Sequence, residues 1–165
     1  MLALIPWLIF LHTLSAITFF LAHGTSMAMA FQIRKETDFA RIRAMLDLSE
    51  ATLIPAFIAF LVMGVSGLVM PFILKLWSKG WIWASIFLIL VVFLQMVFMN
   101  EKRYKILRKL VGLPYRQGNK IFPAESPASP AEMEAHLKKM NVTDLVIVGY
   151  VIPMFVLWLM VFKPF

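Results

Sequence analysis

The sequence predicts an all-α fold, a four-helix transmembrane bundle, on three observations. Of its 165 residues, 61% are hydrophobic and only 15% are charged, whereas soluble domains are about half apolar and about a quarter charged. Four apolar segments are long enough to cross a bilayer, which takes about 20 residues. None of them alternates like a barrel strand. Helices therefore remain the only structure that satisfies their backbone polar groups in lipid.

The four expected spans cover residues 2–31, 51–74, 81–99 and 145–162, and together with the loops they form one membrane domain. The first span ends near an "AMA" triplet that resembles a signal-peptidase site. No basic residue precedes its apolar run, and the run is longer than a signal-peptide core. We therefore interpret it as a membrane span that is retained.

The loops predict the orientation of the bundle. The first and third loops hold four and nine Lys and Arg residues, whereas the second loop holds two and the C-terminal end holds one. The positive-inside rule then places both termini outside, on the periplasmic side, and both larger loops in the cytoplasm. We expect a multi-pass protein of a bacterial inner membrane, surrounded by the lipid bilayer. Because the basic residues follow the spans in this way, we expect no nucleic-acid partner.

The third loop, residues 100–144, has its own predicted organisation. Its start, "EKRYKILRKLVG", continues the third span as a helix with a basic surface that anionic headgroups favour. The stretch that follows, "LPYRQGNKIFPAESPASP", is rich in Pro, Gly and Ser and is expected to be irregular. A short helix near 130–140 begins at the N-cap Ser129, with Glu132 completing a capping box. The first loop is expected to be a solvated segment whose four acidic and four basic residues neutralise one another.

Two of the three histidines, His12 and His23, lie within the first span. Eleven residues of helix rise about 16.5 Å and turn about 1100 degrees, so both side chains share one face. Ionisable groups at membrane depth are uncommon and face the bundle interior. One interpretation makes them haem ligands, since imidazole binds haem iron and four-helix bundles hold cofactors between helices. The other makes each a neutral side chain that hydrogen-bonds a neighbouring helix, worth about 0.6–2 kcal/mol.

Other residues indicate close packing between helices or suggest copper binding. Small residues on two spans let helices approach closely; they are Gly64, Gly67, Ala22 and Ser26. Twelve methionines raise a copper hypothesis, since thioethers suit Cu(I), and two pairs share a helix face, Met63 with Met70 and Met96 with Met99. Methionine is also ordinary packing material. The absence of cysteine excludes disulfides and thiolate sites.

Both ends of the chain carry a resemblance to a known family. The first span contains "FLHTLSAITFF", and the last span closes with "LMVFKPF" after a helix that starts near an aspartate. This layout resembles a family of predicted four-span integral membrane proteins of unknown function, and the matching positions here are His12, Lys163 and Pro164. It is more distantly similar to HemJ-type protoporphyrinogen oxidase, thought to bind haem b, and to the membrane domain of copper-resistance protein D. The HemJ type usually has histidine and lysine residues where this chain has "GWIWASIFL", so we do not expect oxidase activity.

Three functions remain open at the level of sequence. The favoured one is a small non-catalytic subunit or scaffold that packs within or against a larger membrane complex, because no catalytic set of residues is complete. The first alternative is a membrane redox protein that binds haem b through His12, with His23 as a second candidate ligand. The second alternative is a copper-handling membrane protein.

Overall fold

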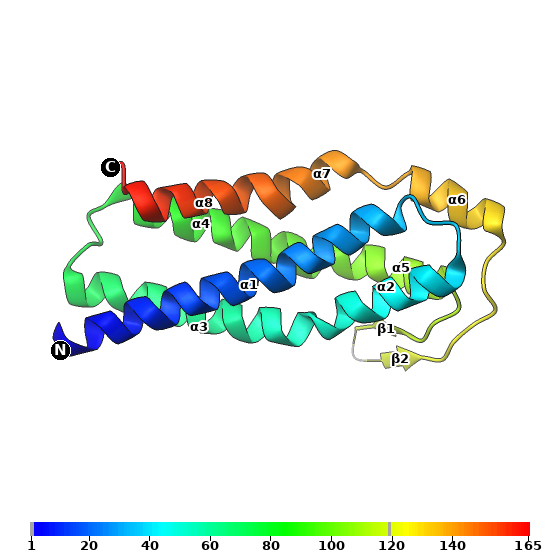
Figure 1. Ribbon diagram of the computed structural model, residues 1–165, viewed down its shortest axis with the longest axis horizontal. Coiled ribbons are helices and arrows are strands. Elements are labelled where there is room, and N and C mark those ends of the chain that lie inside the picture. Colours follow the sequence, from blue (N-terminus) through cyan, green and yellow to red (C-terminus); the bar gives the residue numbers. More distant parts are fainter. Residues whose placement is uncertain (1, 119) are drawn as a thin grey trace.

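The computed structural model describes residues 2–118 and 120–165 and consists mainly of helices that run along one long axis (Figure 1). The elements follow in the order η1 (Leu2–Leu4), α1 (Ile5–Ile33), α2 (Phe39–Ala51), α3 (Leu53–Leu74), α4 (Gly80–Gln95), the π-helical turn η2 (Met96–Asn100), α5 (Glu101–Leu110), β1 (Tyr115–Gln117), β2 (Lys120–Phe122), α6 (Pro130–Lys138), α7 (Val142–Val146), the π-helical turn η3 (Ile147–Val151) and α8 (Ile152–Phe162).

Four helical segments are long and apolar enough to cross a membrane, namely residues 5–33, 39–74, 80–110 and 143–162. Each predicted span falls on one of them, so a mainly helical fold with four membrane-length helices is confirmed. Two of these helical segments, residues 39–74 and 80–110, extend beyond the predicted apolar spans. Only Thr52 separates α2 from α3, and α4 continues through η2 into α5, as the predicted helical extension of the third span requires.

The membrane-length helices form two antiparallel pairs. α1 packs along α3, and α4 packs along α8, with fewer contacts between the pairs. The start of α1 and the end of α8 lie at the same end of the molecule, together with the α3–α4 turn (Figure 1). We name this the turn end. The opposite end, which carries α2, α5, α6 and the two strands, is the loop end.

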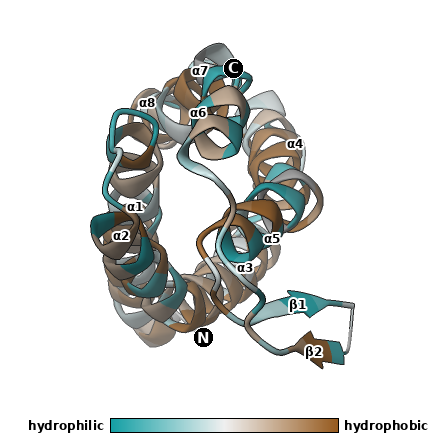
Figure 2. Ribbon diagram, turned by 90° about the vertical axis from the view of Figure 1, so that its right-hand side faces the viewer, coloured by the Kyte–Doolittle hydropathy of each residue, from teal (hydrophilic) through white to brown (hydrophobic). Residues whose placement is uncertain are grey.

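The hydrophobic core is divided into three clusters along the axis. The turn-end cluster joins α4 to α8 through Trp81, Ile82 and Leu159. The central cluster contains Phe19, Ala22, Ala56, Ala59, Met63 and Val92. The loop-end cluster contains Ile33, Ile42, Leu46, Leu107, Val111, Met133, Leu137 and Met140. The end view in Figure 2 shows hydrophilic residues on the helices of the loop end and hydrophobic ones on the helices behind them.

The first loop is only in part the solvated, self-neutralised segment that we predicted. Residues 39–51 form α2, which begins at the N-cap Asp38 and buries Ile42 and Leu46. Its two later carboxylates are not neutralised within the loop. Asp47 and Glu50 instead pair with Arg108 of α5, at 3.0 Å and 2.6 Å. The prediction holds for Glu36 and Asp38, which pair with Arg41 of the same loop. It is wrong for Asp47 and Glu50, because the apolar face of α2 has a partner, α5, that comes from a distant part of the sequence.

The stretch after α5 is also more regular than predicted, because β1 and β2 pair as an antiparallel hairpin. The rings of Tyr115 and Phe122 stack across the strands at a centroid distance of 5.3 Å. The Tyr115 hydroxyl donates to Glu125 at 2.7 Å, and this bond, with Lys109 acting in the same direction, lowers the pKa of the Glu125 carboxyl. Figure 2 shows the hairpin projecting sideways from the helices. The prediction missed this hairpin because it relied on the local Pro, Gly and Ser content, whereas the two strands are joined by stacking between two aromatic rings.

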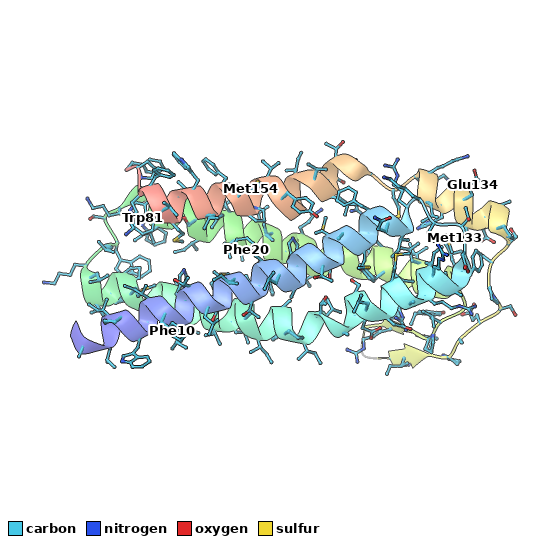
Figure 3. The ribbon with its side chains drawn as sticks, in the orientation of Figure 1. Phe10, Phe20, Trp81, Met133, Glu134 and Met154 are labelled. Carbon is cyan, nitrogen blue, oxygen red and sulfur yellow. The ribbon has the colours of Figure 1, made fainter. Side chains whose placement is uncertain are left out.

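The short helix α6 confirms its predicted start. The Ser129 hydroxyl accepts a hydrogen bond from the Glu132 backbone N–H at 3.3 Å. Met133 is buried in the loop-end cluster, whereas Glu134 lies on the exposed side of the helix (Figure 3). An amphipathic helix therefore closes the loop end of the bundle.

Candidate functional site

His12 joins α1 to α3. Its Nδ1–H donates to the Met63 carbonyl oxygen at 2.9 Å and lies 3.3 Å from the Ser66 hydroxyl. Ser66 in turn donates to the Val62 carbonyl at 2.6 Å. The imidazole lies directly over Gly67, where an added Cβ would come within 2.8 Å of His12 Cε1. His12 thus fills the space that the missing side chain of Gly67 leaves between the two helices.

His23, about three turns further along the same face, is only 3% exposed. Its ring stacks on Phe19 with a centroid distance of 5.5 Å and an interplanar angle of 7°. Its Nε2 is buried and has no hydrogen-bond partner among the described residues. Beside it is a small cavity lined by His23, Met27, Gln95, Arg103, Asp144, Leu145, Val148 and Gly149.

The two histidines face the interior, but they do not form one site. His12 contacts α3 near the turn end, whereas His23 borders a cavity formed with α4, α5, α7 and η3. Phe19 fills the central cluster between them and is 1% exposed. No histidine occurs in α3, α4 or α8, so a bis-histidine ligand pair within one chain has no second member on a facing span.

Gln95, Arg103 and Asp144 belong to the His23 surroundings, although the spacing of the histidines did not indicate them. Arg103 Nη2 lies 3.1 Å from Asp144 Oδ2, and this ion pair ties α5 to α7. Gln95 is the one strongly polar side chain inside its span, which was the sequence signal for this site. Its association with Asp144 could not be inferred because the two residues are 49 positions apart along the chain.

A second polar group joins α1 to the α2–α3 junction and to α5. Ser26 Oγ lies 2.8 Å from Thr52 Oγ1 and accepts from Ser49 Oγ at 3.1 Å. Ser49 also hydrogen-bonds the Tyr104 hydroxyl. Ser26 was predicted as a small packing residue, and the structure adds that its hydroxyl takes part in this network.

The other predicted packing residues differ in their surroundings. Ala22 is buried in the central cluster. Gly67 lies under His12, but no atom lies within 4 Å of the position that a Cβ on Gly64 would take. Gly149, which the sequence did not single out, has the side chain of Met27 filling the space of its missing Cβ. Close approach is therefore required at Gly67 and Gly149, which lie on different helices.

The residues of the family-like tail fold back on α4. Lys163 has a left-handed backbone with φ of 48°, and its Nζ lies 5.9 Å from the centroid of the Trp81 ring. After Pro164, the Phe165 carbonyl accepts the Trp81 backbone N–H at 3.2 Å. An otherwise unpaired donor at the start of α4 is satisfied in this way. Figure 3 shows Trp81 at the turn end, beside the end of α8.

Two of the methionines considered for copper, Met63 and Met96, pack in or against the central cluster. Met63 is buried in the central cluster and Met96 packs against it, whereas the side chain of Met99 lies outside the described residues. Among the side chains that the structure describes, no three His, Cys, Asp or Glu residues come close enough to hold a metal ion.

Comparisons with known proteins identify no relative of this chain. No family model, curated protein or solved structure matches the chain. The resemblance described from the two ends of the sequence therefore stays an expectation.

The contrast between Gly67 and Gly64 gives a test of the α1–α3 contact. Gly67→Ala should lower the free energy of unfolding by about 1–3 kcal/mol, because the new methyl group displaces the His12 ring from its position between the helices. Gly64→Ala should be neutral or stabilising by up to about 1 kcal/mol, because a helical Gly is replaced where space is open. Thermal unfolding in mild detergent, followed by circular dichroism, measures both changes. Equal melting temperatures for the two variants would contradict the described contact, and adding His12→Ala to Gly67→Ala should restore part of the loss.

Proposed function

We propose that this chain is a non-catalytic integral membrane subunit that packs against a different membrane protein through the outer face of α8. The observation that carries this proposal is an apolar groove of about 260 Å³ on that face. Its lining residues are Met154, Leu157, Trp158, Val161 and Phe162. Figure 3 shows Met154 pointing away from the other helices.

The groove has a rigid aromatic wall. Phe155 stacks on Trp158 at a centroid distance of 5.4 Å, and Trp158 lies 5.8 Å from Phe162. Stacked rings have few rotamers to lose on binding, and side-chain ridges of a second helix fit grooves of this kind. Because the groove lies on a membrane-length apolar helix, its occupant must be apolar too. A transmembrane helix of the partner meets this requirement.

The loop end supports a role in contact with a cytoplasmic surface. Helix α5 is amphipathic, and most of the basic residues of the chain lie at this end. Exposed tryptophans lie toward the turn end, among them Trp7 and Trp83, as in the aromatic belts of membrane proteins. We propose that the loop end is cytoplasmic and the turn end periplasmic, in the inner membrane of a bacterium.

The orientation is testable because the chain has no cysteine. Single cysteines are placed at Ser78 in the turn and at Ala135 on the exposed side of α6. A membrane-impermeant maleimide added to intact spheroplasts should label Ser78→Cys and leave Ala135→Cys unlabelled until the membrane is opened. Both variants should react after detergent treatment, which is the control. Labelling of Ala135→Cys alone in intact spheroplasts would reverse the orientation.

The partner is tested by photocrosslinking in cells. A photoreactive phenylalanine analogue replaces Leu157 in the groove, and the matched control replaces Phe87, which is 65% exposed on α4. The groove position should give a discrete product with another membrane protein, identifiable by mass spectrometry, and the control position should not. Products that contain only a second copy of this chain, or lipid at both positions, would contradict the proposal.

Haem binding is the second candidate, and the geometry of His12 favours it. Its Nδ1–H donates to a backbone carbonyl, which leaves Nε2 as the nitrogen available for a metal. Metal-binding histidines usually donate their other ring nitrogen to a carbonyl or carboxylate in this way. His12 could supply one axial ligand, and haem b would supply the redox chemistry.

The absorption spectrum separates this candidate from the first. If His12 binds haem, the protein purified in mild detergent shows a Soret band and, after dithionite, a reduced α-band. Both bands disappear in His12→Ala and remain in a His136→Ala control, since His136 lies on α6 outside the spans. A featureless spectrum of folded wild-type protein would leave His12 as a contact between helices.

A further inference from the structure

The cavity beside His23 brings polar side chains from separate helices together in an otherwise apolar region. Its volume is about 10 Å³, close to the space that one water molecule needs. His23 contributes a buried Nε2 that has no partner among the described residues. Gln95, Arg103 and Asp144, which carry amide, guanidinium and carboxylate groups, line the same cavity. A water requires two to four polar partners, and this set supplies them.

The helices around the cavity depart from regular α-helix at this level. The π-helical turn η2 begins directly after Gln95, and η3 contains Val148 and Gly149 of the cavity wall. Pro153 lacks the N–H that would bond the Gly149 carbonyl in an α-helix, and the Ile152 N–H reaches back to Ile147 instead. Such π-turns occur frequently at functional sites.

The ion pair extends from the cavity to the outer surface of the protein. The Arg103 and Asp144 side chains are 22% and 37% exposed, yet both also line the cavity. They are the charged groups that face His23. Of the other cavity residues, Gln95 on α4 is neutral, Met27 on α1 is apolar, and α7 and η3 add only Leu145, Val148 and Gly149.

We propose that this cavity binds one water molecule and that His23 exchanges a proton with the solution at the loop end through this water and Asp144. The water donates to Nε2 of the neutral histidine and accepts from the Gln95 amide. A proton that arrives on the Asp144 carboxylate passes to the water, and the water passes one of its own protons to Nε2. The water is thereby restored, Asp144 is ionised again and His23 becomes a cation. That cation competes with Arg103 for Asp144, so protonation of His23 weakens the ion pair between α5 and α7.

The test is nuclear magnetic resonance on the full chain in lipid nanodiscs, with ¹⁵N-labelled histidine. Only three histidines occur, so His23→Gln and His12→Gln assign their signals. We expect a magnetisation-transfer peak between water and the His23 ring, and ring-proton exchange faster than at His12. Asp144→Asn should slow the exchange at His23 by at least about tenfold, because it removes the acid–base group. Asp144→Glu, which keeps the carboxylate, should retain the exchange, as should Glu134→Gln on the exposed side of α6.

Two results would overturn the proposal. The first is a wild-type His23 ring that shows no contact with water and exchanges no faster than His12. This measurement needs no substitution at Asp144, so it decides the matter even where Asp144→Asn does not fold. The second is a water contact whose exchange rate is the same in Asp144→Asn and in wild type, which would exclude Asp144 from the route.

Discussion

The close approach of α1 and α3 is the contact on which the rest of the bundle depends. It is the most extensive contact between two helices in the structure. It requires small side chains, with Ala56 and Ala59 in the central cluster and Gly67 beneath His12. In lipid, helices gain little from the hydrophobic effect on pairing, so dispersion contacts and interhelical hydrogen bonds must hold them together. His12 supplies both, since it packs on Gly67 and donates to the Met63 carbonyl.

The loop end adds a second kind of stabilisation, that of a small hydrophobic core beneath polar helix faces. Buried residues from α1, α2, α5 and α6 meet there, and polar faces of the same helices cover them. Arg108 illustrates the difference. Its side chain is 16% exposed and binds two carboxylates of α2 together with the Pro114 carbonyl. It therefore connects the first helix pair to the second, where the spans themselves make few contacts.

The two intramembrane histidines have different environments for a local reason. His12 faces a glycine and the Met63 carbonyl on α3, so its polar group is satisfied by a neighbouring backbone. His23 faces a wall of side chains from helices that contain π-turns, and its Nε2 has no partner in the described protein. The same face of α1 thus packs against α3 toward the turn end and lines a polar cavity toward the loop end.

The sequence by itself determined the helical class, the four membrane-length segments, the helical extension after the third span and the start of α6. These features depend on local composition, periodicity and capping, all of which are visible in one stretch of chain. It also indicated that His12 and His23 share a face, since helix geometry alone decides that. Only the tertiary structure decided which neighbour each histidine meets, that α2 has an apolar partner, and that Tyr115 and Phe122 pair in a hairpin. The association of Gln95 with Asp144 likewise depends on how α4 packs against α7 and η3, and no local pattern in the sequence contains that information.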